Sequence, residues 1–187
     1  MYTIFFIVHI VAKRVLGRKK FIILGNYVIL IANISNLISG VVVAMNAKAE
    51  KWSAFLQENK IECFGVQEVD NEIHTVVFRA FLEIAGQKLP SMLVLDDSIY
   101  SMFQVRVAEK VVTDANKVAV EGILNAYNMK FKVFKYYVGE GGDICLDSCL
   151  PSTAESFDCN IIHAVIDVIL KHLTDEYPKL MKEIWGN

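Results

Sequence analysis

The chain has 187 residues, of which 54% are hydrophobic and 21% charged, and its formal net charge is −2. This length suits one globular domain, and the ordinary content of charge, proline and glycine argues against wholesale disorder or collagen-like structure. The small net charge hides an asymmetry, because residues 1–44 contain five basic side chains and no acidic one, whereas residues 45–187 contain 14 basic and 21 acidic side chains, a formal charge of −7. The sequence therefore predicts two unlike segments that meet near Met45.

The first segment contains an uncharged run that begins at Phe21 and ends at Ala44, long enough to cross a bilayer core of about 30 Å as a helix. A basic cluster at residues 13–20 precedes the run, which favours a cytoplasmic side for that cluster. Three interpretations stay open. The run is a signal anchor that makes the chain a single-pass membrane protein, or it is a signal peptide cleaved after Ala44, or translation starts at Met45 and the protein is cytoplasmic. We favour the last, because everything that resembles a domain begins at Asn46.

Residues 45–187 are interpreted as one domain, because they contain no repeat, no low-complexity tract and no linker rich in proline, glycine and serine. Asn46 is a favourable N-cap, and the apolar stripe that follows predicts a helix up to about Asn59. The stripe consists of Ala49, Trp52, Phe55 and Leu56.

Four extended segments follow this helix at close intervals. The clearest is 74–84, in which alternate residues are apolar, as expected for a strand with one face in the core. Short turns at 85–87 and 96–98 separate the later segments, and connections this short predict antiparallel hairpins rather than crossovers. The four candidate strands are 64–69, 74–84, 89–95 and 99–107.

A second helix and a hairpin come next. Thr113 can cap this helix, and Asn128 suits a left-handed residue at its end. Two further strands, 131–138 and 143–150, flank a glycine-rich turn at residues 139–142.

A long helix closes the chain. Ser152 and Glu155 stand at capping-box spacing before it, and Pro178 either kinks or restarts it. The order helix, meander, helix, hairpin, helix predicts an α+β fold, a two-layer sandwich in which an antiparallel sheet carries helices on one face.

The cysteines do not suggest a disulfide or a metal site. Cys145 and Cys149 would lie about 13 Å apart on one face of a strand, too far for a disulfide or for ligation of one tetrahedral ion. We interpret all four cysteines as core or surface thiols in a reducing compartment, and nothing in their spacing supports a Cys–His nucleophile. The four are Cys63, Cys145, Cys149 and Cys159.

The remaining candidate catalytic or ligand-binding residues are better explained by structural roles. His163 and Asp167 match a solvated i,i+4 pair, and His9, His74 and His172 have no evident partner in the sequence. The glycines at 139–142 precede a strand, whereas a phosphate-binding loop needs a helix there.

The acidic domain has only a small basic cluster, so its charge does not indicate a nucleic-acid-binding surface. The cluster consists of Lys130, Lys132 and Lys135. We therefore predict no catalytic residue, no cofactor-binding residue and no metal ligand. We leave the partner-binding residues open.

The segment Leu124-Asn125-Ala126-Tyr127-Asn128 is followed by Phe131 at the start of a strand, by the acidic glycine turn, and by Leu150-Pro151 before the last helix. In these residues and in the order of its elements, the domain resembles the YbjN family of bacterial sensory-transduction regulators over about residues 46–184. The resemblance implies a fold like that of type III secretion chaperones, which are non-catalytic, often dimeric, and hold extended client segments on a sheet surface or edge.

These observations lead to one expected function and two alternative functions. We expect a non-catalytic regulatory or chaperone-like module that binds a protein partner or a second copy of itself, by strand addition or by burial of apolar side chains on the sheet. The alternative is a membrane-anchored sensor domain held by residues 21–44, so that contact with a membrane depends on those residues being translated and retained. A small enzyme that uses Cys145, Cys149 or Cys159 with a histidine is the third class.

Overall fold

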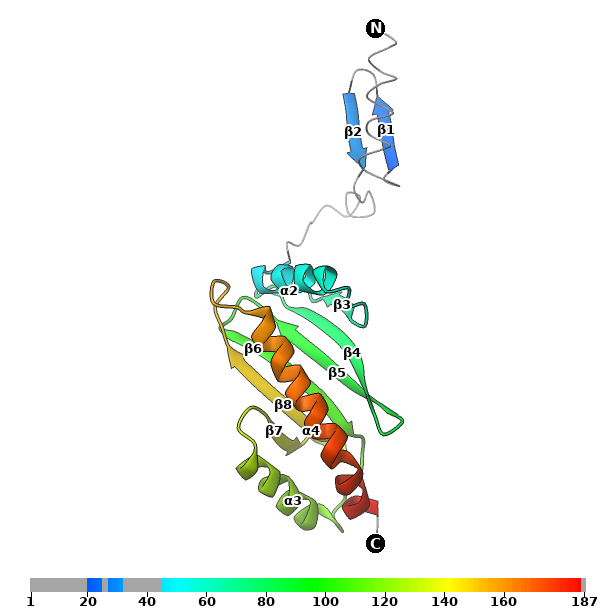
Figure 1. Cartoon of the computed structure of the whole chain (residues 1–187), viewed down its shortest axis with the longest axis vertical. Coiled ribbons are helices and arrows are strands. Elements are labelled where there is room, and N and C mark those ends of the chain that lie inside the picture. The colour runs from blue at the N-terminus through cyan, green and yellow to red at the C-terminus, as the bar shows by residue number, and fades with distance from the viewer. Residues whose placement is uncertain (1–19, 25–26, 32–44, 186–187) are drawn as a thin grey trace. The chain divides into compact units, whose positions relative to one another are not determined.

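The computed structural model describes residues 20–24, 27–31 and 45–185 of the chain. The chain divides between Val43 and Ala44 into two units, each of which is described by itself. In the first unit, strands β1 (Lys20–Leu24) and β2 (Tyr27–Ile31) form an antiparallel pair in which Lys20 lies opposite Ile31 (Figure 1).

These two strands fall on the uncharged run for which a membrane-spanning helix is one of the predictions. The structure is extended rather than helical at residues 21–24 and 27–31, so the prediction of a membrane-spanning helix is wrong for these residues. The rest of the run, residues 25–26 and 32–44, lies outside the described residues. Within the described ranges, no helix combines the length and the apolar composition that crossing a bilayer requires.

The second unit is an α+β sandwich built from a six-stranded antiparallel sheet and three α-helices, and this confirms the predicted fold class. The strand order is β3-β4-β5-β6-β8-β7, so the β7–β8 hairpin adds to the meander through its second strand. The strands are β3 (Gly65–Glu68), β4 (Val76–Ile84), β5 (Gln87–Leu95), β6 (Tyr100–Ala108), β7 (Lys135–Val138) and β8 (Ile144–Pro151). The helices are α2 (Ala47–Glu58), α3 (Lys117–Lys130) and α4 (Cys159–Trp185).

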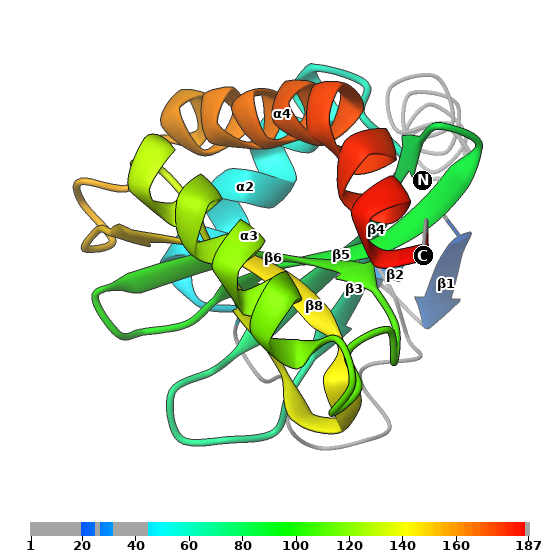
Figure 2. The same ribbon diagram turned by 90° about the horizontal axis from the view of Figure 1, so that it is seen from below.

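The helices share one side of the sheet. Helix α4 crosses in front of the strands in Figure 1, and Figure 2 shows α2 and α4 together on one side of the sheet. Helix α4 contacts β4, α2 and α3, and α3 contacts β7. Between sheet and helices lies one core, whose largest fully buried side chains include Trp52, Phe78, Phe103, Phe134 and Ile169. Removing each such side chain from water stabilises the fold by roughly 1.5–3 kcal/mol.

The first helix forms as predicted, whereas the second begins and ends at later residues than predicted. Helix α2 starts after its N-cap Asn46 and stops at Asn59. Helix α3 begins at Lys117 rather than at Thr113, because a turn intervenes in which the Asn116 side chain accepts the Thr113 N–H at 2.7 Å. It continues to Lys130, so Asn128 lies inside the helix and not in a left-handed end.

The start of the last helix is also predicted too early. Instead of a capping box at Ser152 and Glu155, the structure has a turn in which Thr153 and Ser156 bind each other. Helix α4 begins at Cys159, and the Asp158 carboxylate accepts the Asn160 N–H at 2.8 Å, as an N-cap does. The helix runs through Pro178 without a break, which excludes a restart there.

The predicted glycine turn between β7 and β8 is confirmed, and Gly142 explains its composition. This residue has a φ of +87°, and a Cβ atom there would collide with the carbonyl oxygen of Val112. The Gly142 carbonyl accepts hydrogen bonds from the N–H groups of Val111 and Val112 at 3.1 and 3.0 Å. A side chain at this position would break the link that ties the hairpin to the segment before α3.

Candidate functional site

The four cysteines have different surroundings in the fold. All four are free thiols, with Cys63 and Cys149 exposed, Cys145 buried and Cys159 partly buried. Burial raises the pKa of the Cys145 and Cys159 thiols, whereas an activated nucleophile needs a lowered pKa. Within the described ranges, no group of three or more His, Cys, Asp or Glu side chains is placed to hold a metal ion.

The histidines fall into three situations. His163 Nδ1 lies 3.5 Å from Asp167 Oδ2 on the solvent side of α4, which is the predicted solvated pair. His9 lies outside the described residues. His74 and His172, for which the sequence shows no partner, each have one in the fold, because residues far apart in the chain meet there.

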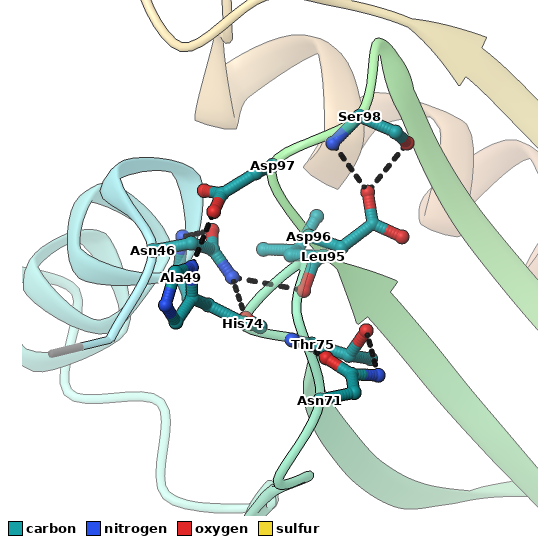
Figure 3. Close-up of polar contacts among 9 residues, drawn as sticks. All are labelled: Asn46, Ala49, Asn71, His74, Thr75, Leu95, Asp96, Asp97 and Ser98. Carbon is teal, nitrogen blue, oxygen red and sulfur yellow. Dashed lines mark hydrogen bonds and ion pairs between the residues drawn. The ribbon is translucent and has the colours of Figure 1, made fainter. Parts of the chain in front are cut away.

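A polar cluster joins the start of α2 to two loops at one end of the sheet (Figure 3). The buried Asn46 side chain makes three hydrogen bonds: its Oδ1 accepts the Ala49 N–H at 2.9 Å, and its Nδ2 donates to the carbonyl oxygens of His74 and Leu95 at 2.7 and 2.9 Å. Asn46 therefore caps the helix and also fixes the ends of β4 and β5 against it.

The same cluster contains histidine, aspartate and serine side chains, but they do not form a catalytic triad. His74 Nδ1 lies 2.5 Å from Asp97 Oδ2, while the Ser98 hydroxyl donates to Asp96 Oδ1 and not to the imidazole (Figure 3). A nucleophilic serine would need the histidine as its base. This arrangement instead holds the loop between β5 and β6 in place.

Lys48 reinforces that loop from inside the fold. Its side chain is buried, and Nζ donates to the carbonyl oxygens of Ser98 and Tyr100 at 2.8 and 2.7 Å. Burial lowers the pKa of this amine, which the carboxylates of Asp96 and Asp97 partly oppose. We interpret Lys48 as a structural residue, because both of its described contacts are backbone carbonyls.

A buried histidine lies among aromatic rings between α3, β7 and α4. His172 Nε2 lies 2.8 Å from the Tyr136 hydroxyl, and its ring packs against Tyr127, Phe131 and Phe134. Burial lowers the pKa of His172 to about 4, so the imidazole is neutral at neutral pH. Tyr127 of α3 packs in the same cluster. The cluster is a core contact rather than an accessible site.

The two edges of the sheet differ in whether they can accept another strand. At the β7 edge, the Asn128 side chain accepts the Tyr136 N–H at 2.7 Å and donates to the Tyr136 carbonyl at 2.9 Å, as a neighbouring strand would. At the other edge, β3 is exposed along its whole length and pairs only with β4 among the described strands. The β3 edge is therefore the one open to strand addition.

Asn128→Ala should lower the free energy of unfolding by about 1–2 kcal/mol, because both backbone groups of Tyr136 lose their partner. Chemical denaturation measures the change. Asn125→Ala is the matched control, since Asn125 is an exposed residue on the same helix. Equal stability of the two variants would show that Asn128 does not close this edge.

The face of the sheet opposite the helices is a candidate binding site, and we call it the open face. No described residue outside the sheet strands and their connections covers it, and its aromatic side chains Phe81, Tyr100 and Tyr137 are 65%, 54% and 40% exposed. The residues that point to this side are Gln67, Val77, Arg79, Phe81, Glu83, Lys88, Pro90, Met92, Val94, Tyr100, Met102, Gln104, Arg106, Tyr137, Cys145, Asp147, Cys149 and Pro151.

Polar groups occupy the middle of the open face. Gln104 Nε2 donates to the Tyr137 hydroxyl at 2.8 Å, and Arg106 Nε lies 3.3 Å from Asp143 Oδ2. Burial raises the pKa of Asp147, and its Oδ1 atom is buried without a hydrogen-bond partner in the part of the chain that is described. The face thus combines apolar side chains with a small number of charged groups, the composition of many protein-binding surfaces.

Comparison with known proteins does not assign this site. No family model matches the chain, and no curated protein matches it.

Proposed function

We propose that residues 45–185 form a non-catalytic regulatory or chaperone-like module, of the kind found in the YbjN family, which binds a protein partner on the open face. The observation that carries the proposal is the exposure of aromatic side chains, with two partly exposed methionines beside them, on a sheet face that no described helix covers. Aromatic residues and methionine are enriched in the central part of protein interfaces.

The open face is a better binding surface than the sheet edges. Asn128 closes the β7 edge, and the β3 edge offers only Gly65–Glu68 for pairing. Such a short edge can add a few backbone hydrogen bonds, whereas the open face can bury several large apolar side chains of the partner. We therefore place the main contact on the face, with strand addition at β3 as a supplement.

The Phe81→Asp/Tyr100→Asp double variant should lose partner binding. Two carboxylates on the open face would have to be desolvated in the complex, so we expect recovery of the partner to fall at least about tenfold. The measurement is affinity purification of the tagged full-length chain with quantitative mass spectrometry, together with light scattering to detect a second copy as the partner.

The matched control is Val118→Asp/Met129→Asp, which adds the same charge at two exposed positions of α3, away from the open face. It should recover the partner as the wild type does. A strictly monomeric chain with no reproducible partner would contradict the proposal, and so would a partner that both double variants retain equally.

We further propose that this module works in the cytoplasm and is translated from Met45. This proposal is supported by the change of composition at that residue and by the stabilising cluster that begins with Asn46. The mature N-terminus, determined by intact-mass spectrometry, tests it. A mass that includes residues 1–44 would overturn it, as would recovery of the tagged full-length protein in the membrane fraction.

A further inference from the structure

The open face has a shallow depression at its centre, and arginine side chains contribute to its lining. Its volume is about 200 Å³, and it is lined by Arg79, Pro90, Ser91, Met92, Gln104 and Arg106. Arg79 belongs to β4 and Arg106 to β6, so the two guanidinium groups approach from opposite sides of β5. From this arrangement, and resting on the proposed function, we infer that the depression binds the carboxylate of an aspartate or glutamate in the partner.

The guanidinium group of Arg79 keeps N–H donors available for a ligand. Its Nε donates to Gln67 Oε1 at 3.1 Å and its Nη1 contacts the Met92 sulfur at 3.8 Å, which orients the group across the depression. It forms no ion pair with any acidic side chain in the described part of the chain. A guanidinium carries five N–H donors in a planar fork that matches a carboxylate, so Arg79 keeps donors for a ligand.

Arg106 is already partly engaged. Its Nε lies 3.3 Å from Asp143 Oδ2, which fixes the side chain and leaves the terminal nitrogens free of any described acidic partner. Asp143 offsets the charge of Arg106, whereas the charge of Arg79 has no acidic partner among the described residues. A single carboxylate neutralises the charge of Arg79, whereas a doubly charged phosphoryl group would exceed it. Asp147, which lies opposite Gln104 in the sheet, also disfavours a second negative charge.

The local charge is unusual for this domain. Residues 45–187 have a formal charge of −7, yet the centre of the open face presents two arginines. A highly acidic partner would be repelled by the domain as a whole, while one acidic residue in an otherwise neutral segment would find a complementary site. Charge complementarity therefore selects the position of one acidic side chain rather than a run of them.

Apolar groups lie on both sides of the depression along the strands. Phe81 and Pro90 are paired across β4 and β5 toward one end, and Val77 and Val94 are paired toward the other. A segment that places its carboxylate between Arg79 and Arg106 would therefore set its neighbouring side chains on apolar surface. The recognised pattern is an aspartate or glutamate flanked by apolar residues.

A random peptide display library tests this pattern without knowledge of the natural partner. The full-length wild type, the Arg79→Gln/Arg106→Gln variant and a Lys132→Gln/Lys171→Gln control are each used to select peptides. The control removes the same charge at two exposed positions outside the depression. Wild type and control should enrich apolar peptides with one central acidic residue, and the arginine variant should enrich apolar peptides without it.

The selected peptide then gives a quantitative test by calorimetry. Its affinity should fall at least about tenfold when its acidic residue is replaced by the matching amide, and by a similar factor for Arg79→Gln. The two changes together should cost little more than either alone, because both remove the same contact.

The outcomes separate this inference from the proposed function. Apolar peptides selected without any acidic preference, or an acidic preference that survives in the arginine variant, would overturn the carboxylate site and leave the protein-binding face standing. A wild type that selects no peptide at all would count against both.

Discussion

Asn46→Ala should lower the free energy of unfolding by about 3 kcal/mol. The substitution removes the N-cap of α2, which is worth about 1 kcal/mol, and leaves the carbonyl oxygens of His74 and Leu95 without their donor. Each buried acceptor that loses its partner costs about 1–3 kcal/mol, and Asn46 itself is buried. Small domains are stable by only about 5–15 kcal/mol, so this one side chain supports a large share of the total.

Urea denaturation of the full-length wild type and of the variant measures this loss. Asn59→Ala is the matched control, because Asn59 ends the same helix and its side chain makes one exposed hydrogen bond to the Phe55 carbonyl. That control should cost less than about 1 kcal/mol. If Asn46→Ala were no more harmful than Asn59→Ala, the cluster in Figure 3 would not hold the sheet to the helix.

The parts of the fold that the sequence predicts correctly are those with local signals. Helix α2 has its cap and its apolar stripe within one short segment, and the strands of the meander show alternation with short turns. The late starts of α3 and α4 have a common cause. In each case Thr and Asn or Ser side chains form a turn just before the helix, and the sequence pattern of such a turn resembles that of a cap.

The candidate site could be predicted only in part. Alternation in β4, β5 and β6 indicates which residues point away from the core, including Arg79 and Phe81. That the face stays bare depends on α2 and α4 packing on the other side, which no local pattern determines. The closure of the β7 edge by Asn128 is equally non-local, because that side chain acts on a strand reached only after the chain has turned back.

The stability of the domain should fall on acidification because of His172. Burial lowers its pKa to about 4 in the folded state, against about 6.5 in an unfolded chain. Well above pH 6.5 the imidazole is neutral in both states and has no effect on stability. Below that value the unfolded state binds a proton that the folded state does not, so the free energy of unfolding decreases until the pH reaches about 4.

The size of this effect follows from the difference in pKa. Between pH 7 and pH 5, His172 should account for a loss of about 2 kcal/mol, with about 3 kcal/mol reached by pH 4. The dominant cause is burial among Tyr127, Phe131, Phe134 and Tyr136, while the smaller influences of Glu176 and Lys130 oppose each other. Protonation would therefore weaken the packing of α4 against α3 and β7.

Denaturation of wild type, His172→Gln and His163→Gln at pH 7 and at pH 5 tests this assignment. The His172 variant starts less stable, because glutamine packs poorly among the rings, but it should lose about 2 kcal/mol less than the wild type between the two pH values. The His163 variant changes an exposed residue on the same helix and should follow the wild type. If all three proteins lost the same stability on acidification, another group would be the one that titrates, and His172 would be only a packing residue.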